Sequence, residues 1–227
     1  MNRRPARPAA GFTLTELLVV IAIIAVLVAI IVPAFSAVRR SADRTTCVAN
    51  LRQIGAAIGS YTVDHEGDLP GPLWTWQSCW YDGDDYGSLP TALGAYLGLE
   101  IYSEKARAEV FVCPSWQKGG PYLQDELFIL NTTEQVDGTP INPWGDAELV
   151  EESDPPSTAP NAPDRPKKLV ALTDAGLTKT WAIQELDLAS PFPKMPRGIA
   201  PKPVHGEIRH TLFFDFHVAG VAVKPKP

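Results

Sequence analysis

A long, unbroken apolar segment lies close to the N-terminus of the chain. Sixteen apolar residues follow one another from Leu17 to Val32, and Glu16 is the only charged residue between Phe12 and Phe35. As a helix, the 24 residues from Phe12 to Phe35 are about 36 Å long, more than a hydrocarbon core of about 30 Å. The pattern predicts a membrane-spanning helix over residues 12–35.

Beyond Pro33 the pattern changes from uniformly apolar to amphipathic. Pro33 removes one helical hydrogen bond, so it should bend or locally melt the helix without ending it. Gly67 and Pro70 should end the helix. One helix over residues 12–64, about 80 Å long, is therefore expected, with residues 36–64 as an amphipathic stalk. Its apolar face recurs at steps of three or four residues: Cys47, Leu51, Ile54, Ile58 and Tyr61.

Residues 65–227 hold most of the 22 prolines and predict a globular head with long irregular loops. We expect a short helix over Leu89–Leu99, with Pro90 in its first turn. Strands are expected over residues 109–113, 127–130 and 168–173, and within 205–218. The predicted fold class is α+β: a long N-terminal helix, its first half transmembrane, packed on a small antiparallel sheet.

Charge is distributed unevenly along the chain. The formal net charge is −6, and without residues 1–11, which carry Arg3, Arg4 and Arg7 and no acid, it would be −9. An acidic body excludes nucleic acid as an expected partner, because binding it requires a basic surface. The leading arginines should keep the N-terminus cytoplasmic and place the head across the membrane.

Three interpretations of the N-terminus compete. A secretory signal peptide, cut near Ala34-Phe35-Ser36, would account for the basic start, but the apolar run exceeds the usual 7–15 residues. A plain uncleaved anchor would account for the hydrophobicity and leave Glu16 unexplained. A carboxylate entering a bilayer costs on the order of 2–3 kcal/mol, so an intramembrane acid indicates a function.

The third interpretation rests on a resemblance. The string Gly11-Phe12-Thr13-Leu14-Thr15-Glu16, followed by the apolar run, closely resembles the type IV prepilin signature. In that family a prepilin peptidase cuts after the glycine and methylates the new amino group. The resemblance implies that residues 1–11 are a leader peptide, cut off between Gly11 and Phe12, and that Phe12 is methylated. Pro33 would be mature position 22, where pilins often carry a helix-bending proline.

The signature has a physical logic of its own. Cleavage would create a positive amine at Phe12, four residues from the Glu16 carboxylate. An unpaired charge in an apolar filament core is very costly, so the amine of a correctly aligned neighbouring subunit could neutralise Glu16. Pairing within one subunit remains the alternative.

The three cysteines, Cys47, Cys79 and Cys113, fit no metal-binding spacing. Outside the cytoplasm, one disulfide and one free thiol are expected. The stretch from Arg44 to Gly55 and the string Phe111-Val112-Cys113-Pro114 resemble secretion-type pseudopilins. That resemblance favours a Cys47–Cys113 disulfide and leaves Cys79 free.

A segment rich in tryptophan and aspartate runs from Trp74 to Tyr86. Asp82, Asp84 and Asp85 could supply oxygen ligands to Ca²⁺, although the spacing is not that of an EF-hand. The aromatic rings could instead bind a sugar or a protein partner. The third interpretation is a turn at Asp82-Gly83 whose aromatic residues cover the core.

Titratable residues gather near the C-terminus, at His205, His210, Asp215 and His217. They could form a metal site or a general acid–base pair, or Asp215 could orient His210 or His217 by a hydrogen bond. The segment resembles the ending of many pseudopilins, with Phe216 in place of a turn glycine. We therefore expect one continuous strand, with its alternate residues on one face: Leu212, Phe214, Phe216 and Val218.

Taken together, the resemblance implies a structural subunit of a type II secretion pseudopilus or related type IV pilus, with no catalytic activity and no cofactor. Its expected partners are sister subunits, the prepilin peptidase and an inner-membrane assembly platform. The expected location is the inner membrane, single-pass, with a periplasmic head and the assembled filament in the cell envelope. A membrane-tethered module binding carbohydrate or protein through Trp74 or Trp76 is the alternative. An anchored metalloenzyme is the third.

Overall fold

The structure is a computed structural model that describes residues 14–83, 86–100, 104–118, 126–136, 139–150, 162, 164–187, 199–200 and 202–223. The chain divides into two compact units, Met1–Ala42 and Asp43–Pro227.

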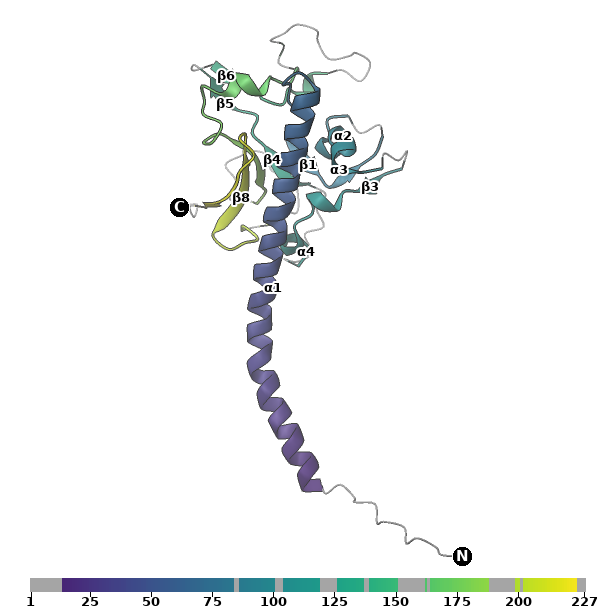
Figure 1. Ribbon diagram of the computed structural model, residues 1–227, viewed down its shortest axis with the longest axis vertical. Helices are drawn as coiled ribbons and strands as arrows, with labels where there is room; N and C mark the ends of the chain where they lie inside the picture. Colours follow the sequence, from purple (N-terminus) through teal and green to yellow (C-terminus); the bar gives the residue numbers. More distant parts are fainter. Residues whose placement is uncertain are drawn as a thin grey trace, which may run out of the picture. The chain divides into compact units, whose positions relative to one another are not determined.

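Helix α1 (Leu14–Asp64) is continuous through Pro33 (Figure 1). The hydroxyl of Ser36, one turn further along the helix, donates a hydrogen bond to the carbonyl oxygen of Pro33 at 2.8 Å. Residues 14–42 of the helix are exposed throughout. Among the described residues, α1 is the one helix long and apolar enough to cross a membrane by length and composition.

The second unit is built on an antiparallel five-stranded sheet with the strand order β1-β4-β7-β8-β9. Its strands are β1 (Trp76–Ser78), β4 (Glu126–Leu130), β7 (Trp181–Glu185), β8 (Ile208–Phe213) and β9 (Val218–Ala222). Two small ribbons accompany it: β2 (Trp80–Tyr81) with β3 (Ala106–Arg107), and β5 (Glu134–Val136) with β6 (Thr139–Ile141). The short helices are α2 (Leu89–Ala92), α3 (Gly94–Leu97), α4 (Pro114–Lys118) and the 3₁₀ helices Glu109–Phe111, Ala147–Leu149 and Leu169–Leu172.

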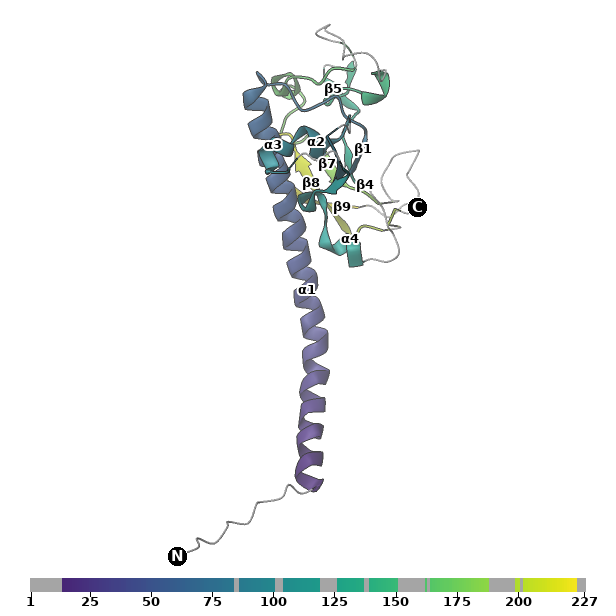
Figure 2. The same ribbon diagram turned by 90° about the vertical axis from the view of Figure 1, so that its right-hand side faces the viewer.

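The turns of α1 from Asp43 onward pack on this sheet, and the two views show them running beside it (Figure 2). Four residues of the predicted apolar stripe are buried, Cys47, Leu51, Ile54 and Ile58, and the fifth, Tyr61, is half-buried. Two glycines on α1 allow a close approach. A Cβ added at Gly55 would lie 2.8 Å from the Cδ1 atom of Leu212, and one at Gly59 would lie 3.2 Å from the ring of Phe216. The predicted α+β fold, a long helix packed on an antiparallel sheet, is confirmed.

Two predicted strands are wrong. Residues 109–113 contain the 3₁₀ helix Glu109–Phe111, and residues 168–173 contain the 3₁₀ helix Leu169–Leu172. In each case the 3₁₀ turn brings one large apolar side chain, Phe111 or Leu172, to full burial without a strand partner. Short apolar runs do not distinguish the two conformations. The strand predicted at 127–130 is present as β4.

The helix predicted over Leu89–Leu99 is interrupted. The Oγ atom of Ser88 accepts a hydrogen bond from the backbone N–H of Thr91 and caps α2. Leu93 then leaves the helical conformation at φ −96° and ψ 3°, and α3 follows as a separate turn. Gly98 ends α3 in the left-handed conformation, which glycine adopts without a Cβ clash.

The continuous strand predicted near the C-terminus is also wrong, because β8 and β9 form a hairpin. The backbone N–H of Phe213 donates to the carbonyl oxygen of His217 at 3.0 Å, and Phe216 occupies the left-handed region at φ 67°. Phe216 thus makes the turn that a glycine would make more easily. Its ring packs over Gly59 of α1, a contact that a glycine at position 216 would lack and that favours the strained conformation.

Candidate functional site

The predicted processing site lies at the edge of the described chain. Gly11 and Phe12 are outside the described residues, and α1 begins at Leu14 with Glu16 in its first turn. Glu16 precedes sixteen exposed apolar residues, Leu17 to Val32. The structure therefore places the carboxylate at the N-terminal end of an exposed apolar helix. Its pairing with the Phe12 amine of another subunit remains a prediction.

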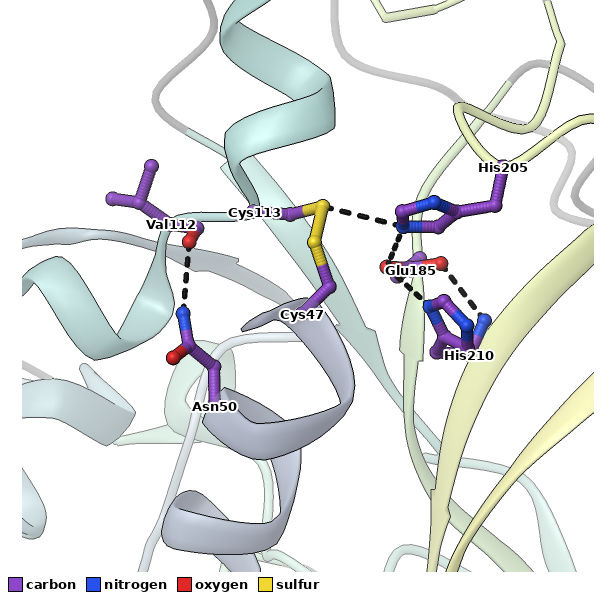
Figure 3. Close-up of a disulfide and its surroundings, with 7 residues drawn as sticks. All are labelled: Cys47, Asn50, Val112, Cys113, Glu185, His205 and His210. Carbon is purple, nitrogen blue, oxygen red and sulfur yellow. Dashed lines mark hydrogen bonds and ion pairs between the residues drawn. A yellow bond between two sulfur atoms is a disulfide. The ribbon is translucent and has the colours of Figure 1, made fainter. Parts of the chain in front are cut away.

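A disulfide joins α1 to the head at Cys47 and Cys113, the pairing favoured from the sequence (Figure 3). One turn along the helix, the side-chain amide of Asn50 donates to the carbonyl oxygen of Val112 at 2.9 Å. This second tie holds the segment that carries Cys113 against α1 through a contact other than the disulfide. Cys79 is buried and is not part of this disulfide.

Beside the disulfide lies a buried cluster of Glu185, His205 and His210 (Figure 3). Glu185 ends β7, His210 lies on the adjacent strand β8, and His205 lies in the turn that precedes β8. The Oε1 atom of Glu185 is 3.0 Å from Nε2 of His205 and 3.2 Å from Nδ1 of His210. Its Oε2 atom accepts the backbone N–H of His210 at 2.8 Å.

These contacts shift the pKa of the Glu185 carboxyl group. Burial raises the pKa of its carboxyl group, but hydrogen bonds and positive charge from His205 and His210 lower it, and the pKa ends below its ordinary value. The Nε2 atom of His205 also lies 3.3 Å from Sγ of Cys113, so the cluster touches the disulfide directly.

The four C-terminal residues singled out from the sequence do not form one site. His205 and His210 turn toward Glu185, whereas Asp215 and His217 pair with each other in the β8–β9 turn, 2.5 Å apart. Burial raises the pKa of Asp215, but hydrogen bonds with His217 lower it and leave the pKa below its ordinary value. Of the alternatives for Asp215, the hydrogen bond to His217 is the one present.

Glu185 was not predicted from the sequence as a site residue. It is the acidic residue that ends the short strand β7, and nothing in its neighbours marks it as the partner of two histidines 20 and 25 positions later. A buried ion pair close by was missed for the same reason. Arg209 donates to both carboxylate oxygens of Asp187, at 2.5 and 2.8 Å.

The aspartates proposed as calcium ligands are only partly described. Asp82 follows β2, and its backbone carbonyl oxygen accepts the hydroxyl of Thr91 at 3.2 Å. Asp84 and Asp85 lie outside the described residues. The calcium site therefore remains a prediction.

The tryptophans of the same segment point to different parts of the head. Trp76 packs on a small core cluster with Ile129, and Trp80 packs against the main core. Trp74 is 39% exposed, and its indole N–H donates to the carbonyl oxygen of Tyr86 at 2.7 Å. Two of these three rings cover the core, as the third interpretation of this segment expected.

Comparison with known proteins identifies a family motif near the N-terminus of the chain. Residues 6–32 match the family model of the prokaryotic N-terminal methylation motif. The chain is also similar to a ComG operon protein 3 homolog of Bacillus licheniformis, with 35% identity over 60 residues. That similarity covers 26% of this chain and 62% of the relative, and no solved structure matches the chain. The chain thus carries a prepilin-type N-terminal methylation motif, followed by a long helix packed on an antiparallel sheet.

Proposed function

We propose that this protein is a structural subunit of a pilin-like filament, assembled through the N-terminal part of α1. The observation that carries the proposal is the methylation motif at residues 6–32, which coincides with the start of an exposed apolar helix. An exposed apolar face of this length is unstable in water, because its burial is strongly favourable. Lipid before assembly, and the helices of sister subunits afterwards, would provide that burial.

Glu16 supplies the specificity of the proposed assembly. Apolar helices pack against one another at many offsets with similar energy, so apolar contact alone does not set a subunit's position. A buried carboxylate is satisfied only where a positive group lies within hydrogen-bond distance. The methylated amine of Phe12 on the neighbouring subunit would provide that group at one offset.

The proposed orientation follows from charge and from sulfur chemistry. Three arginines precede the apolar segment and favour a cytoplasmic N-terminus. The Cys47–Cys113 disulfide supports a head on the far side of the inner membrane, because disulfides persist in oxidising compartments. A prepilin peptidase and an inner-membrane assembly platform are the machinery that such a subunit requires. Secretion pseudopili and related type IV pili are the assemblies that fit a subunit of this kind. In this proposal the subunit has no catalytic role of its own.

Mass spectrometry of the protein extracted from its native membrane tests the processing step. The expected N-terminal peptide begins at an N-methylated Phe12, with residues 1–11 absent. A peptide that begins at Met1 would contradict the proposal in favour of a plain anchor. One that begins after Ser36 would contradict it in favour of a secretory signal peptide.

A further inference from the structure

The disulfide and the buried Glu185 cluster together hold a set of metal-binding donor atoms. One donor atom from each of Cys47, Cys113, Glu185 and His205 lies within 4.8 Å of the other three, and all four residues are buried (Figure 3). They come from α1, from the residue immediately before α4, from the end of β7 and from the turn before β8. Two sulfurs, one imidazole and one carboxylate are ligands that zinc accepts in four-coordinate sites.

Two of the spacings between these atoms are close to those of a tetrahedral zinc site, whereas the two sulfurs are bonded to each other and would have to separate. Zinc–ligand distances of about 2.0–2.3 Å place neighbouring donors about 3.3–3.8 Å apart. Here Sγ of Cys113 lies 3.3 Å from Nε2 of His205, which lies 3.0 Å from Oε1 of Glu185. While the disulfide is intact, the sulfurs are bonded to each other and offer no thiolate. Reduction would free both.

We propose that the reduced chain binds one Zn²⁺ through Sγ of Cys47, Sγ of Cys113, Nε2 of His205 and Oε1 of Glu185, and that disulfide formation releases the ion. On binding, the two thiols lose their protons to solvent and become thiolate ligands. On oxidation, one thiolate attacks the S–S bond of a disulfide-containing oxidant, which breaks to give a mixed disulfide, and the second thiolate then displaces the oxidant. The Cys47–Cys113 bond forms, the oxidant takes up two protons and becomes a dithiol, and zinc leaves as the hydrated ion.

The surroundings of the cluster hold its ligands in place. The backbone N–H and the ring of His210 both bond to Glu185, so the carboxylate has a fixed direction. Partners of this kind orient metal ligands and raise affinity. The guanidinium of Arg44 donates to the carbonyl oxygen of His205 at 3.0 Å and fixes the loop that carries this imidazole.

Contacts other than the disulfide should keep the two cysteines close to each other after reduction. The hydrogen bond from Asn50 to the carbonyl oxygen of Val112 joins α1 to the residue next to Cys113. Phe111 and Trp116, on either side of Cys113, are buried in the core. The reduced protein therefore presents both thiols to Glu185 and His205 without needing the covalent bond. Newly made chains carry thiols until an oxidant acts, which gives the site a period in which it is available.

Metal titration of the full chain in detergent tests the proposal. The protein carries Cys79→Ala, so that two thiols remain, and no histidine tag. Zn²⁺ is measured by elemental analysis after reduction and gel filtration, and Co²⁺ substitution reports thiolate ligation by its charge-transfer absorption. The expected result is one Zn²⁺ per reduced chain and none per oxidised chain, with tetrahedral cobalt bands that disappear on oxidation.

Histidine variants separate a built site from adventitious binding. His205→Gln should weaken zinc binding by at least about tenfold, whereas His217→Gln, which changes an exposed histidine outside the cluster, should leave it unchanged. Equal zinc binding by reduced and oxidised protein, or by the two variants, would overturn the proposal. If reduction unfolds the head, zinc should restore the native tryptophan fluorescence, and a head that stays unfolded in excess zinc would equally overturn it.

Discussion

The Cys47–Cys113 disulfide provides the sharpest stability prediction. The two cysteines are 66 positions apart, and both are buried where α1 meets the head. For a closed loop of that length, the chain-entropy relation gives about 4 kcal/mol of stabilisation at 25 °C through restriction of the unfolded chain. Disulfides removed from native proteins typically cost about 2–5 kcal/mol, a large part of a total unfolding free energy of about 5–15 kcal/mol.

The perturbation is the double change Cys47→Ala and Cys113→Ala. Alanine is chosen because a buried serine would leave hydroxyl groups to satisfy. The hydrogen bond from Asn50 to Val112 remains, so the native segments still meet and most of the loss arises in the unfolded chain. We expect the free energy of unfolding of the head to fall by about 2–4 kcal/mol.

Urea unfolding of the full chain in detergent measures this change. Tryptophan fluorescence reports it, because Trp116, close to Cys113, and Trp144 are buried in the head. Cys79→Ala is the matched control, since it also removes a buried sulfur and leaves the disulfide intact. If the double variant and the control unfold at the same urea concentration, the reasoning from loop closure is refuted.

Two further substitutions test the close packing of α1 on the head and the buried ion pair between Arg209 and Asp187. Gly55→Ala gains about 1 kcal/mol of helix propensity, but its Cβ would lie 2.8 Å from Leu212, which is fully buried, and overpacking costs about 1–3 kcal/mol. We expect net destabilisation by urea unfolding, and a smaller or opposite effect for Gly59→Ala; a stabilised Gly55→Ala would contradict the close packing. Arg209→Ala leaves the buried Asp187 carboxylate without its bidentate partner, so we expect a loss of about 3–5 kcal/mol in thermal or urea unfolding. Recovery in the double variant with Asp187→Ala would support this, and an unchanged midpoint in the single variant would contradict it.

The long helix was predictable because its signals are local and repeated. An apolar run of sixteen residues and a stripe at steps of three and four residues act over many turns, so α1 forms where the pattern predicts. The buried face at Cys47, Leu51, Ile54 and Ile58 follows from the same periodicity. Gly55 and Gly59 also lie on this helix, but no local pattern showed that a hairpin packs against them.

The short elements of the head could not be predicted in the same way. The pattern of residues 109–113 and 168–173 predicts strands, but each segment forms a 3₁₀ turn that buries one large apolar side chain, Phe111 or Leu172. Phe216 adopts a positive φ because a tertiary contact with α1 favours it. The intrinsic backbone propensity of phenylalanine takes no account of such a contact.

The candidate site residues also differ in whether the sequence alone could reveal them. The motif around Gly11, Phe12 and Glu16 is contiguous and could be recognised from sequence. The Glu185 cluster joins three elements and is assembled only when the sheet forms. The gathering of histidines in the sequence was a real signal, but the acid nearest in sequence, Asp215, is not the one that His205 and His210 contact.

Assembly of the Glu16→Ala variant in the native host tests the central claim most directly. The variant and a Thr15→Ala control are expressed in place of the native chain, and subunits are counted in sheared filament fractions and as cross-linked oligomers. The account predicts that Glu16→Ala is absent from both while its head retains the Cys47–Cys113 disulfide, and that Thr15→Ala assembles normally. Normal assembly of Glu16→Ala would contradict the account.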